Sequence, residues 1–254
     1  MSKQNTGARI FITGSADGLG QLTAKSLADQ GHQVVLHARN TERGRDALHY
    51  VPGAEAVLTG DLSSMEETKE LAHKVNELGT FDAIIHNAGV YQVSGKIIFA
   101  VNTLAPYILT CLIQKPKRLI YLSSGMHLQG HANLENFTKD VNRISYSDSK
   151  LHVLMLSKIV AGRWREVYSN AVDPGWVPTK MGGKGAPDNL QKGYETQVWL
   201  AVSDEDIAKV SGQYFFHKKE NRYNTESNDV NVQQRFLDRC REITGIDFDE
   251  QIGN

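Results

Sequence analysis

The stretch Thr13-Gly-Ser-Ala-Asp-Gly-Leu-Gly20 joins a short apolar run, 8–12, to a segment with helical spacing of its apolar residues, 21–28. Three glycines therefore lie where a strand turns into a helix. A backbone without side chains can approach a pyrophosphate closely, and the start of a helix offers it unpaired N–H groups. An ordinary strand-to-helix turn is the alternative, but one or two glycines would suffice for it. The stretch favours a nucleotide-binding loop.

Apolar runs typical of buried strands alternate with helical patterns along the chain. The strands are expected at 8–12, 32–37, 54–59, 81–86, 118–122, 167–172 and 213–216. The helices are expected at 21–28, 41–50, 64–78, 97–114, 146–164, 190–202 and 230–243. Such alternation predicts a parallel sheet covered by helices on both faces. We expect an α/β protein with a single Rossmann domain over residues 1–254, built on a doubly wound parallel sheet of about seven strands.

Composition and charge argue against several classes of protein. Hydrophobic residues make up 40% and charged residues 22%, close to the averages of globular proteins. A net charge of −1 gives no field that would recruit nucleic acid or an anionic membrane. Cys111 and Cys240 are too few for a disulfide framework. Residues 1–6 lack a signal-peptide core, and no apolar run approaches the roughly 18 residues of a membrane span. We expect a cytoplasmic protein with no metal, membrane or nucleic-acid partner.

Polar and turn residues follow the expected strands. Ligands of such sheets bind outside the carboxyl ends of the strands, at the point where the strand order reverses. The residues at these ends are the glycine loop, Arg39, Asp61, Asn87-Ala88-Gly89, Ser124 and Pro174-Gly175. Their convergence on one edge of the sheet predicts a binding site there.

Tyr146 and Lys150 lie four residues apart at the start of an expected helix, so their side chains share one face. A free phenol, with a pKa of about 10, is a poor acid-base catalyst at neutral pH. We expect a nearby ammonium, desolvation and the positive charge of a nicotinamide to favour the phenolate. Tyr214 and Lys218 have the same spacing, but they fall on an expected strand and its end. We interpret that second pair as a packed tyrosine and a solvated lysine.

Together these motifs resemble those of compact, one-domain short-chain dehydrogenases/reductases over about residues 8–245. The motifs are Thr13-Gly14-x-x-x-Gly18-x-Gly20, Asn87-Ala88-Gly89, Asn102, Ser123-Ser124, Tyr146-x-x-x-Lys150 and Pro174-Gly175. Three stretches resemble the retinol-dehydrogenase-like branch: Tyr121-Leu-Ser-Ser-Gly-Met-His127, Tyr146-Ser-Asp-Ser-Lys-Leu151 and Ser211-Gly-Gln-Tyr-Phe215. Unlike that branch, the chain is expected to lack an N-terminal membrane anchor, and its segment 89–102 is short.

The resemblance implies a catalytic tetrad. Tyr146 would exchange a proton with the substrate oxygen, and Lys150 would lower the pKa of that phenol and bind the nicotinamide ribose. Ser124 would hydrogen-bond the substrate oxygen, with Ser123 as its rival. Asn102 would hold a water in a relay to Lys150. His127 is interpreted as a polar residue at the rim and is left out of the tetrad.

The resemblance also implies cofactor contacts. The glycine loop would meet the pyrophosphate, Asp61 and Leu62 the adenine, and 87–89 the adenosine-side ribose. Val177 and Thr179 would meet the carboxamide. The full set is Gly14, Ser15, Asp17, Gly18, Leu19, Gly20, Arg39, Asp61, Leu62, Asn87, Ala88, Gly89, Tyr146, Lys150, Pro174, Gly175, Val177 and Thr179.

Arg39 indicates which cofactor is preferred. The second strand ends in His37-Ala38-Arg39-Asn40, with no carboxylate before Glu42 to accept a hydrogen bond from a ribose 2′-OH. An arginine can instead hold a 2′-phosphate bidentately, and Arg43 lies one helical turn further on. We expect NADP(H) to be preferred over NAD(H). A solvated arginine that opens a loop is the alternative.

The expected function is NADP-dependent interconversion of a carbonyl and an alcohol. Two rivals are an extended short-chain enzyme, for which the chain is short, and an NADP-binding sensor with little turnover. Leu128, Trp176, Met181 and other apolar residues suggest a partly apolar substrate, although core packing explains them nearly as well. We also expect a substrate-binding loop at about 176–192, mobile over 179–191 until ligands bind, and a homodimer or homotetramer.

Overall fold

The computed structural model describes residues 7–249 of the 254-residue chain. The N-terminal stretch 1–6, in which no signal peptide is expected, lies outside the described residues, as do residues 250–254.

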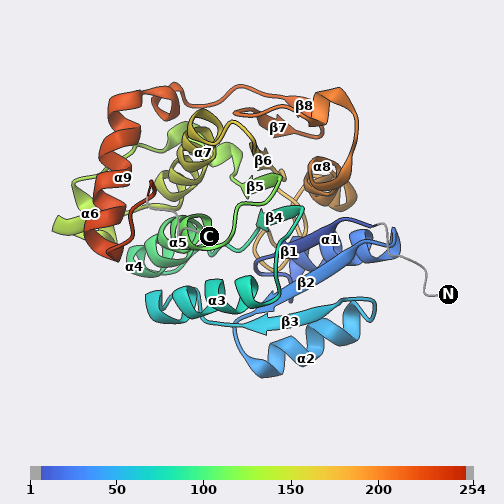
Figure 1. Ribbon diagram of the computed structural model, residues 1–254. Helices are drawn as coiled ribbons and strands as arrows, with labels where there is room; N and C mark the ends of the chain where they lie inside the picture. Colours follow the sequence, from blue (N-terminus) through green and yellow to red (C-terminus); the bar gives the residue numbers. More distant parts are fainter. Residues whose placement is uncertain (1–6, 250–254) are drawn as a thin grey trace.

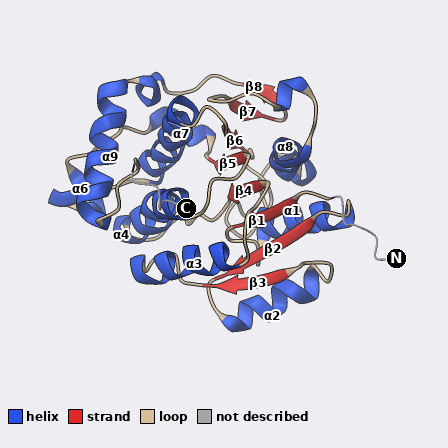
Figure 2. Cartoon of the chain, in the orientation of Figure 1, coloured by secondary structure: helices blue, strands red, loops and turns tan. Residues whose placement is uncertain are grey.

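One sheet of eight strands runs through the described residues, in the order β3-β2-β1-β4-β5-β6-β7-β8 (Figures 1 and 2). The strands are β1 (Arg9–Ile12), β2 (Gln33–Ala38), β3 (Ala56–Thr59), β4 (Ala83–His86), β5 (Arg118–Leu122), β6 (Tyr168–Asp173), β7 (Tyr214–Phe216) and β8 (Lys219–Glu220). All neighbours pair in parallel except β7 and β8. The doubly wound parallel sheet is confirmed. The expected number of strands is one short because β8 is a two-residue polar strand, which leaves no apolar run to recognise.

Helices cover both faces of this sheet (Figure 1). On one face lie α1 (Gly18–Asp29), α2 (Thr41–Tyr50) and α8 (Leu190–Val202). On the other lie α3 (Met65–Glu77), α4 (Gly95–Ile98), α5 (Ala105–Leu112) and α7 (Tyr146–Arg163), with α6 (Asn136–Lys139) and α9 (Val230–Thr244) outside them. Each face has its own apolar core, one around Leu27 and Leu36 and the other around Phe11 and Tyr107. Both cores contribute burial that stabilises the sheet from either side.

Side-chain caps fix where the helices begin. Asp17 caps α1, Asn40 caps α2, and Ser64 caps α3 by accepting a hydrogen bond from the Glu67 N–H. Ser145 and Asp148 form a reciprocal capping box at the start of α7. This box places Tyr146 as the first residue of α7, beside the carboxyl end of β5.

The helix Gly95–Leu112 contains a π-helical segment, Phe99–Leu104, between α4 and α5. Its mean hydropathy of 1.4 over 18 residues would suffice for a membrane span, so the expectation that no apolar run approaches that length is wrong. The helix is apolar on all sides because 78% of it is buried within this chain, where it packs against α3 and α7.

The order of the sheet reverses between β1 and β4. Ile12 at the end of β1 is level with Leu36 of β2 and with Ile85 of β4. The glycine loop after Ile12 therefore lies at the reversal point, where ligands of this fold class bind.

Candidate active site

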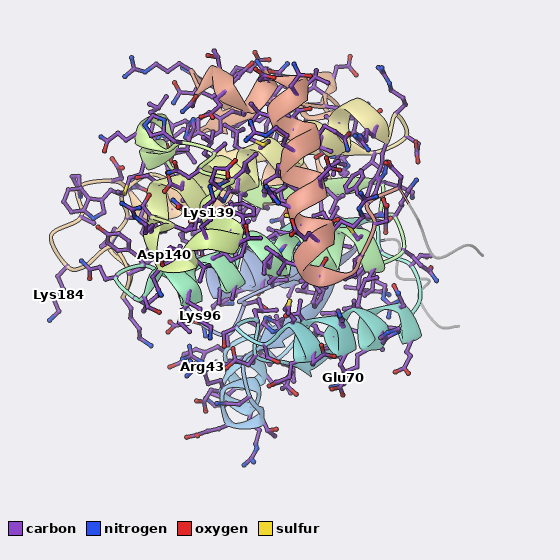
Figure 3. All side chains as sticks on the ribbon, turned by 90° about the vertical axis from the view of Figure 1, so that its left-hand side faces the viewer. Arg43, Glu70, Lys96, Lys139, Asp140 and Lys184 are labelled. Atoms are coloured by element: carbon purple, nitrogen blue, oxygen red, sulfur yellow. The ribbon has the colours of Figure 1, made fainter. Side chains whose placement is uncertain are left out.

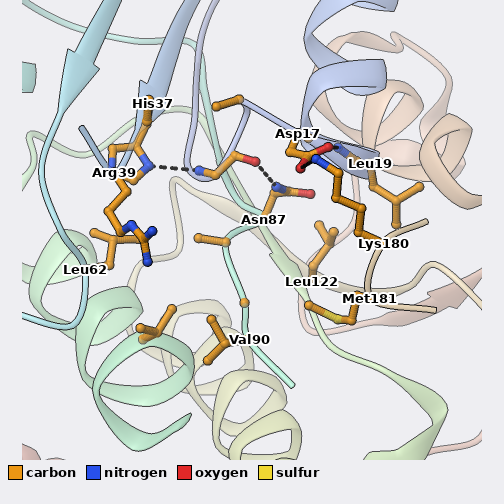
Figure 4. Close-up of a pocket in the computed structure, with 18 of the residues that line it drawn as sticks. Asp17, Leu19, His37, Arg39, Leu62, Asn87, Val90, Leu122, Lys180 and Met181 are labelled. Carbon is orange, nitrogen blue, oxygen red and sulfur yellow. Dashed lines mark hydrogen bonds and ion pairs between the residues drawn. The ribbon is translucent and has the colours of Figure 1, made fainter. Parts of the chain in front are cut away.

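A cavity of about 480 Å³ lies along the carboxyl ends of the strands (Figure 4). Most of the residues expected from the sequence line it: Gly14, Asp17, Gly18, Leu19, Gly20, Arg39, Asp61, Leu62, Asn87, Ala88, Gly89, Tyr146, Lys150, Pro174 and Thr179. These residues come from the loops after β1 to β4, from α7 and from the segment after β6. The structure therefore brings together segments that are far apart in the sequence.

The glycine loop fits a ligand that needs close approach to the backbone. Gly14 has φ +64°, and a Cβ there would lie 2.9 Å from the Ala88 Cα. A Cβ on Gly20 would lie 2.3 Å from the Asn87 Nδ2. That amide donates to the carbonyl oxygens of Thr13 at 2.9 Å and Gly14 at 3.1 Å. The loop is thus packed against the end of β4 and carries no side chain at its glycines, as a pyrophosphate site requires.

Cationic side chains surround the end of the cavity beside β2 and β3. Arg39 is exposed, lines the cavity, and has no ion-pair partner among residues 7–249. Arg43 instead pairs with Asp17 at 3.3 Å, and Lys180 pairs with the same carboxylate at 2.5 Å. Burial would raise the pKa of Asp17, but Lys180, the Gly18 N–H and Arg43 together lower it. Asp17 therefore remains an anion that engages two cations, which leaves Arg39 as the guanidinium available to a phosphate.

Tyr146 and Lys150 lie at the opposite end, and their side chains share one face of α7, as their spacing predicts. The Lys150 Nζ is 5.5 Å from the centroid of the Tyr146 ring and donates to the Leu122 carbonyl at 2.8 Å. Burial lowers the pKa of Lys150 to about 8, and the carboxylate of Asp173 opposes this shift. Burial raises the pKa of Tyr146 to about 12, while a hydrogen bond with Ser124 lowers it. The expectation that desolvation favours the phenolate is therefore wrong, because burial disfavours the charged form.

The two neighbouring serines have different partners. The Ser123 hydroxyl is buried and donates to the Lys150 carbonyl at 2.8 Å, so it holds α7 against β5. Ser124 is half-buried, and its hydroxyl lies within hydrogen-bonding reach of the Tyr146 phenol. Ser123 and not Ser124 is among the residues that line the cavity, but the Ser123 hydroxyl is already engaged by the Lys150 carbonyl, so the contact with Tyr146 favours Ser124 as the group that meets a substrate oxygen.

Asn102 is fully buried within the π-helical segment. Its Oδ1 accepts from the Val90 N–H at 2.8 Å, and its Nδ2 donates to the Val90 carbonyl and the Ser149 hydroxyl, both at 3.0 Å. A Cβ on Gly89 would lie 3.2 Å from the Lys150 Nζ and 3.6 Å from the Asn102 Oδ1. Asn102 therefore fixes the backbone next to Lys150, and π-helical segments often occur at such functional positions.

The remaining expected residues lie outside the lining of the cavity. Ser15 is fully buried, and its hydroxyl donates to the Ile12 carbonyl at 2.9 Å, so it holds the glycine loop from beneath. Val177 is buried against Gly182 and Gly193. Gly175 has φ +78° and makes the turn after β6. These three residues therefore support the backbone of the segments that line the cavity and do not line it themselves.

Two histidines differ from what the sequence suggested. His127 is fully buried rather than at the rim, packed against Tyr214, and bonded to the Ser124 carbonyl at 2.6 Å and the Asn224 N–H at 3.2 Å. The sequence predicts His37 only as part of a strand, yet it lines the cavity. A histidine within an apolar run gives no sign of a polar role. Only its position at the carboxyl end of an expected strand indicates that it could face the site.

Several of the exposed large apolar side chains lie on segments that flank the residues of the site in sequence or contact them. They are Tyr91, Val93, Met126, Leu128, Trp176 and Met181. Tyr91 packs edge-on against the Tyr146 ring at 4.8 Å between centroids.

Comparisons with known proteins agree with this geometry. The family model described as short chain dehydrogenase matches residues 8–113. An uncharacterized oxidoreductase of Emericella nidulans is 46% identical over 94% of this chain and 97% of its own. The short-chain dehydrogenase chyC of Penicillium rubens is 42% identical over 94% and 98%, and retinol dehydrogenase 13 of Mus musculus is 28% identical over 94% and 84%.

Solved structures share the fold. An uncharacterized protein of Mycobacterium paratuberculosis superposes with a TM-score of 0.79 at 23% identity, covering 95% of this chain and 94% of its own. The RhlG/NADP active-site complex of Pseudomonas aeruginosa gives 0.68 at 19% identity, covering 84% and 98%. With the motifs and relatives described above, the chain belongs to the short-chain dehydrogenase/reductase family, in its retinol-dehydrogenase-like branch, and is an oxidoreductase acting on CH–OH or C=O groups.

Proposed function

We propose that this enzyme interconverts a ketone or aldehyde and its alcohol with NADP(H), and that Tyr146 exchanges the proton with the substrate oxygen. The observation that carries this proposal is one cavity with Tyr146 and Lys150 at one end and, at the other, Arg39, which has no ion-pair partner within residues 7–249. A bound nicotinamide supplies or accepts the hydride. The protein supplies the proton, the position of the substrate oxygen and the site that holds the cofactor.

Proton transfer is the task of Tyr146. Its pKa of about 12 keeps the phenol protonated at neutral pH, so it can donate to the oxygen of a carbonyl that is being reduced. The Ser124 hydroxyl, within reach of the same phenol, positions that oxygen. The Lys150 ammonium lies close enough to stabilise the phenolate that is left after donation.

Arg39 supports the preference for NADP(H). It stands at the end of β2, where short-chain enzymes that prefer NAD would place a carboxylate for the ribose 2′-OH. Bidentate binding by its guanidinium would offset the charge of a 2′-phosphate. RhlG of Pseudomonas aeruginosa, which shares the fold, has a solved structure with NADP in its active site.

The substrate is proposed to be a partly apolar small molecule. The exposed side chains of Tyr91, Met126, Leu128, Trp176 and Met181 lie on the loops next to Tyr146, where the substrate must enter. An apolar substrate that covers them gains roughly 25 cal/mol for each Å² of apolar surface removed from water.

A homo-oligomer and a cytoplasmic location are further proposals. The apolar side chains of α5 and α7, such as Tyr107, Leu154 and Met155, are buried within one chain. An oligomer would therefore have to use other surfaces. Light scattering at micromolar concentration tests this proposal, and a mass near 28.2 kDa would contradict it. Imaging of a tagged protein tests the location.

The direct test is consumption of NADPH with a panel of aldehydes and ketones graded by size and polarity. Turnover with at least one lipophilic carbonyl, and faster use of NADPH than NADH, is expected. Tight NADPH binding without turnover on any member would instead favour the sensor reading.

A further inference from the structure

His37 makes contacts that neither the family motifs nor the proposed chemistry use. It is 3% exposed and stands at the carboxyl end of β2, inside the lining of the cavity. Its Nδ1 accepts a hydrogen bond from the Gly14 N–H at 2.9 Å, and its Nε2 lies 2.9 Å from the Gly60 carbonyl oxygen. Figure 4 shows the first of these bonds, next to the one from Asn87 to the Gly14 carbonyl.

These two bonds fix the protonation of the ring. Gly14 N–H is a donor, so Nδ1 must carry a lone pair, whereas a carbonyl oxygen only accepts, so Nε2 must carry the proton. The backbone of His37 adds two bonds to the same loop: its N–H donates to the Ser15 hydroxyl at 2.8 Å, and its carbonyl accepts from the Ser15 N–H at 3.1 Å. One residue thus joins the glycine loop to the end of β3.

We propose that the neutral His37 imidazole is a positioning residue: it holds Gly14 in the conformation that receives the cofactor, and its protonation releases that loop and weakens cofactor binding. A doubly protonated ring has an N–H at Nδ1, which would face the Gly14 N–H. The bond would be lost, and both the His37 Nδ1–H and the Gly14 N–H would be left without an acceptor. The inference rests on the proposed function only in requiring that a dinucleotide binds in this cavity.

Charged neighbours act on His37 from several elements. Asp61, after β3, raises the pKa of the ring, as does the hydrogen bond to Gly60, but burial lowers it more strongly. Arg39 and Arg43, after β2, and Asp17, after β1, line the same cavity. A lowered pKa means that the neutral form, and with it the loop geometry, persists below the usual pKa of histidine near 6.5 and is lost only as the pH falls through the lowered pKa of the folded protein.

Calorimetric binding of NADP⁺ and NAD⁺ between pH 8 and pH 5 tests the proposal. A 2′-phosphate itself titrates with a pKa of about 6, which would weaken NADP⁺ binding alone. The loss of affinity that is due to His37 must appear with both NADP⁺ and NAD⁺. We expect affinity for NAD⁺ to fall about tenfold or more at the acid end in the wild-type protein.

Paired variants separate positioning from folding. His37→Asn places an amide oxygen where Nδ1 stood, so it should bind NAD⁺ within a few-fold of wild type at pH 8 and lose the acid dependence. His37→Leu should bind about tenfold more weakly at every pH. His86→Asn is the matched control, since His86 is also buried at the end of a strand but lies outside the cavity lining. It should keep the wild-type pH profile.

Nitrogen NMR of the His37 ring gives a readout independent of the variants. The expected spectrum shows an unprotonated Nδ1 and a protonated Nε2 at pH 8, and a Gly14 amide signal that shifts as the ring titrates. A protonated Nδ1 at pH 8, or NAD⁺ binding whose pH dependence survives in His37→Asn, would overturn the proposal. If wild type binds neither dinucleotide at any pH, the proposed function fails instead, and the Gly14 signal still decides the role of His37.

Discussion

The two ends of the cavity are built differently. At the end beside β1 and β2, the glycine loop is held by buried and partly buried hydrogen bonds that involve uncharged side chains: those of His37, Asn87 and Ser15. At the end beside β5 and β6, Met181 lines the cavity and Trp176 lies nearby on the same loop; both side chains are exposed, and this loop has no regular structure. Lys180 anchors the second region to the first through its exposed ion pair with Asp17.

This difference teaches which part of the molecule is preformed. Buried hydrogen bonds are costly to break because each lost bond leaves a polar group unsatisfied, so the cofactor end has one conformation. An exposed ion pair contributes only about 0.2–1 kcal/mol, so the loop at the substrate end opens easily. Lys184 lies on that loop, where it stands out from the body of the protein (Figure 3). We infer a fixed cofactor site beside an adaptable substrate site.

The largest expected effect comes from the proton donor at the substrate end of the cavity, and it should leave the cofactor end unchanged. Tyr146→Phe removes the transferable proton but keeps the ring packed against Tyr91, so kcat should fall about 10²- to 10⁴-fold while the Kd for NADPH stays near normal. Steady-state kinetics and fluorescence binding measure the two quantities. Tyr91→Phe is the matched control and should keep most of the rate. A Tyr146→Phe protein with more than about a tenth of the wild-type rate would mean that the proton comes from another group.

Arg39→Asp alters the cofactor end alone. It removes the guanidinium and supplies an acceptor for a ribose 2′-OH, so binding of NADPH should weaken about 10- to 100-fold while NADH is spared or improved. Arg43→Gln should have a smaller effect, because Arg43 already pairs with Asp17. Kinetics with both cofactors measure the ratio. Equal or better kcat/KM with NADH in the wild-type protein would contradict the role given to Arg39.

The buried Lys150 should lower the free energy of unfolding. Burial lowers its pKa from 10.5 to about 8, which corresponds to roughly 3 kcal/mol against the charged form in the folded state. Lys150→Met removes that penalty but leaves the Leu122 carbonyl without its donor, so unfolding at pH 7 should cost about 2 kcal/mol more than in wild type.

The pH dependence of that gain follows from the same shift. Between pH 8 and pH 10.5 the folded lysine releases its proton before the unfolded one, so wild type gains stability and the advantage of Lys150→Met shrinks. Urea unfolding at pH 7 and pH 10 measures both values. Lys25→Met, on the exposed face of α1, is the control and should change stability by less than about 0.5 kcal/mol. A less stable Lys150→Met at pH 7 would refute this account.

The smallest effect concerns the loop at the substrate end. Lys180→Gln removes its ion pair with Asp17, so trypsin should cleave after Lys184 about two- to fivefold faster. Lys192→Gln, at the start of α8, is the control and should leave that rate unchanged. NADP(H) with substrate should slow the cleavage in wild type. Equal rates with and without ligands would argue against a loop that orders over the site.

The sequence predicts the cofactor end better than the substrate end for a physical reason. A strand-to-helix turn that approaches a pyrophosphate requires glycine, so Gly14, Gly18 and Gly20 leave a pattern in the chain. His37 leaves no such pattern. Its role depends on the Gly14 N–H and the Gly60 carbonyl oxygen, which only the folded sheet brings close to its ring. The substrate end uses exposed apolar residues at no fixed spacing, and core residues look the same in a sequence.

Some errors have the same origin. The buried state of His127 could not be predicted, because it depends on Tyr214 and Asn224, about a hundred residues further along the chain. Likewise β8 is defined only by its pairing with β7. Pairing and burial between distant segments are the features that local patterns do not contain.

The most direct test of the account is transfer of deuterium from NADPH labelled at carbon 4 of the nicotinamide, in either configuration, to the best carbonyl of the panel. The product should carry the label at the carbinol carbon when wild-type enzyme is used with one of the two labelled forms, and Tyr146→Phe should give almost none in the same time. If wild type binds NADPH and yields no labelled alcohol from any carbonyl, the chain is a cofactor-binding protein without this chemistry. Labelled product from Tyr146→Phe at the wild-type rate would equally contradict the account, because the proton donor would then be another group.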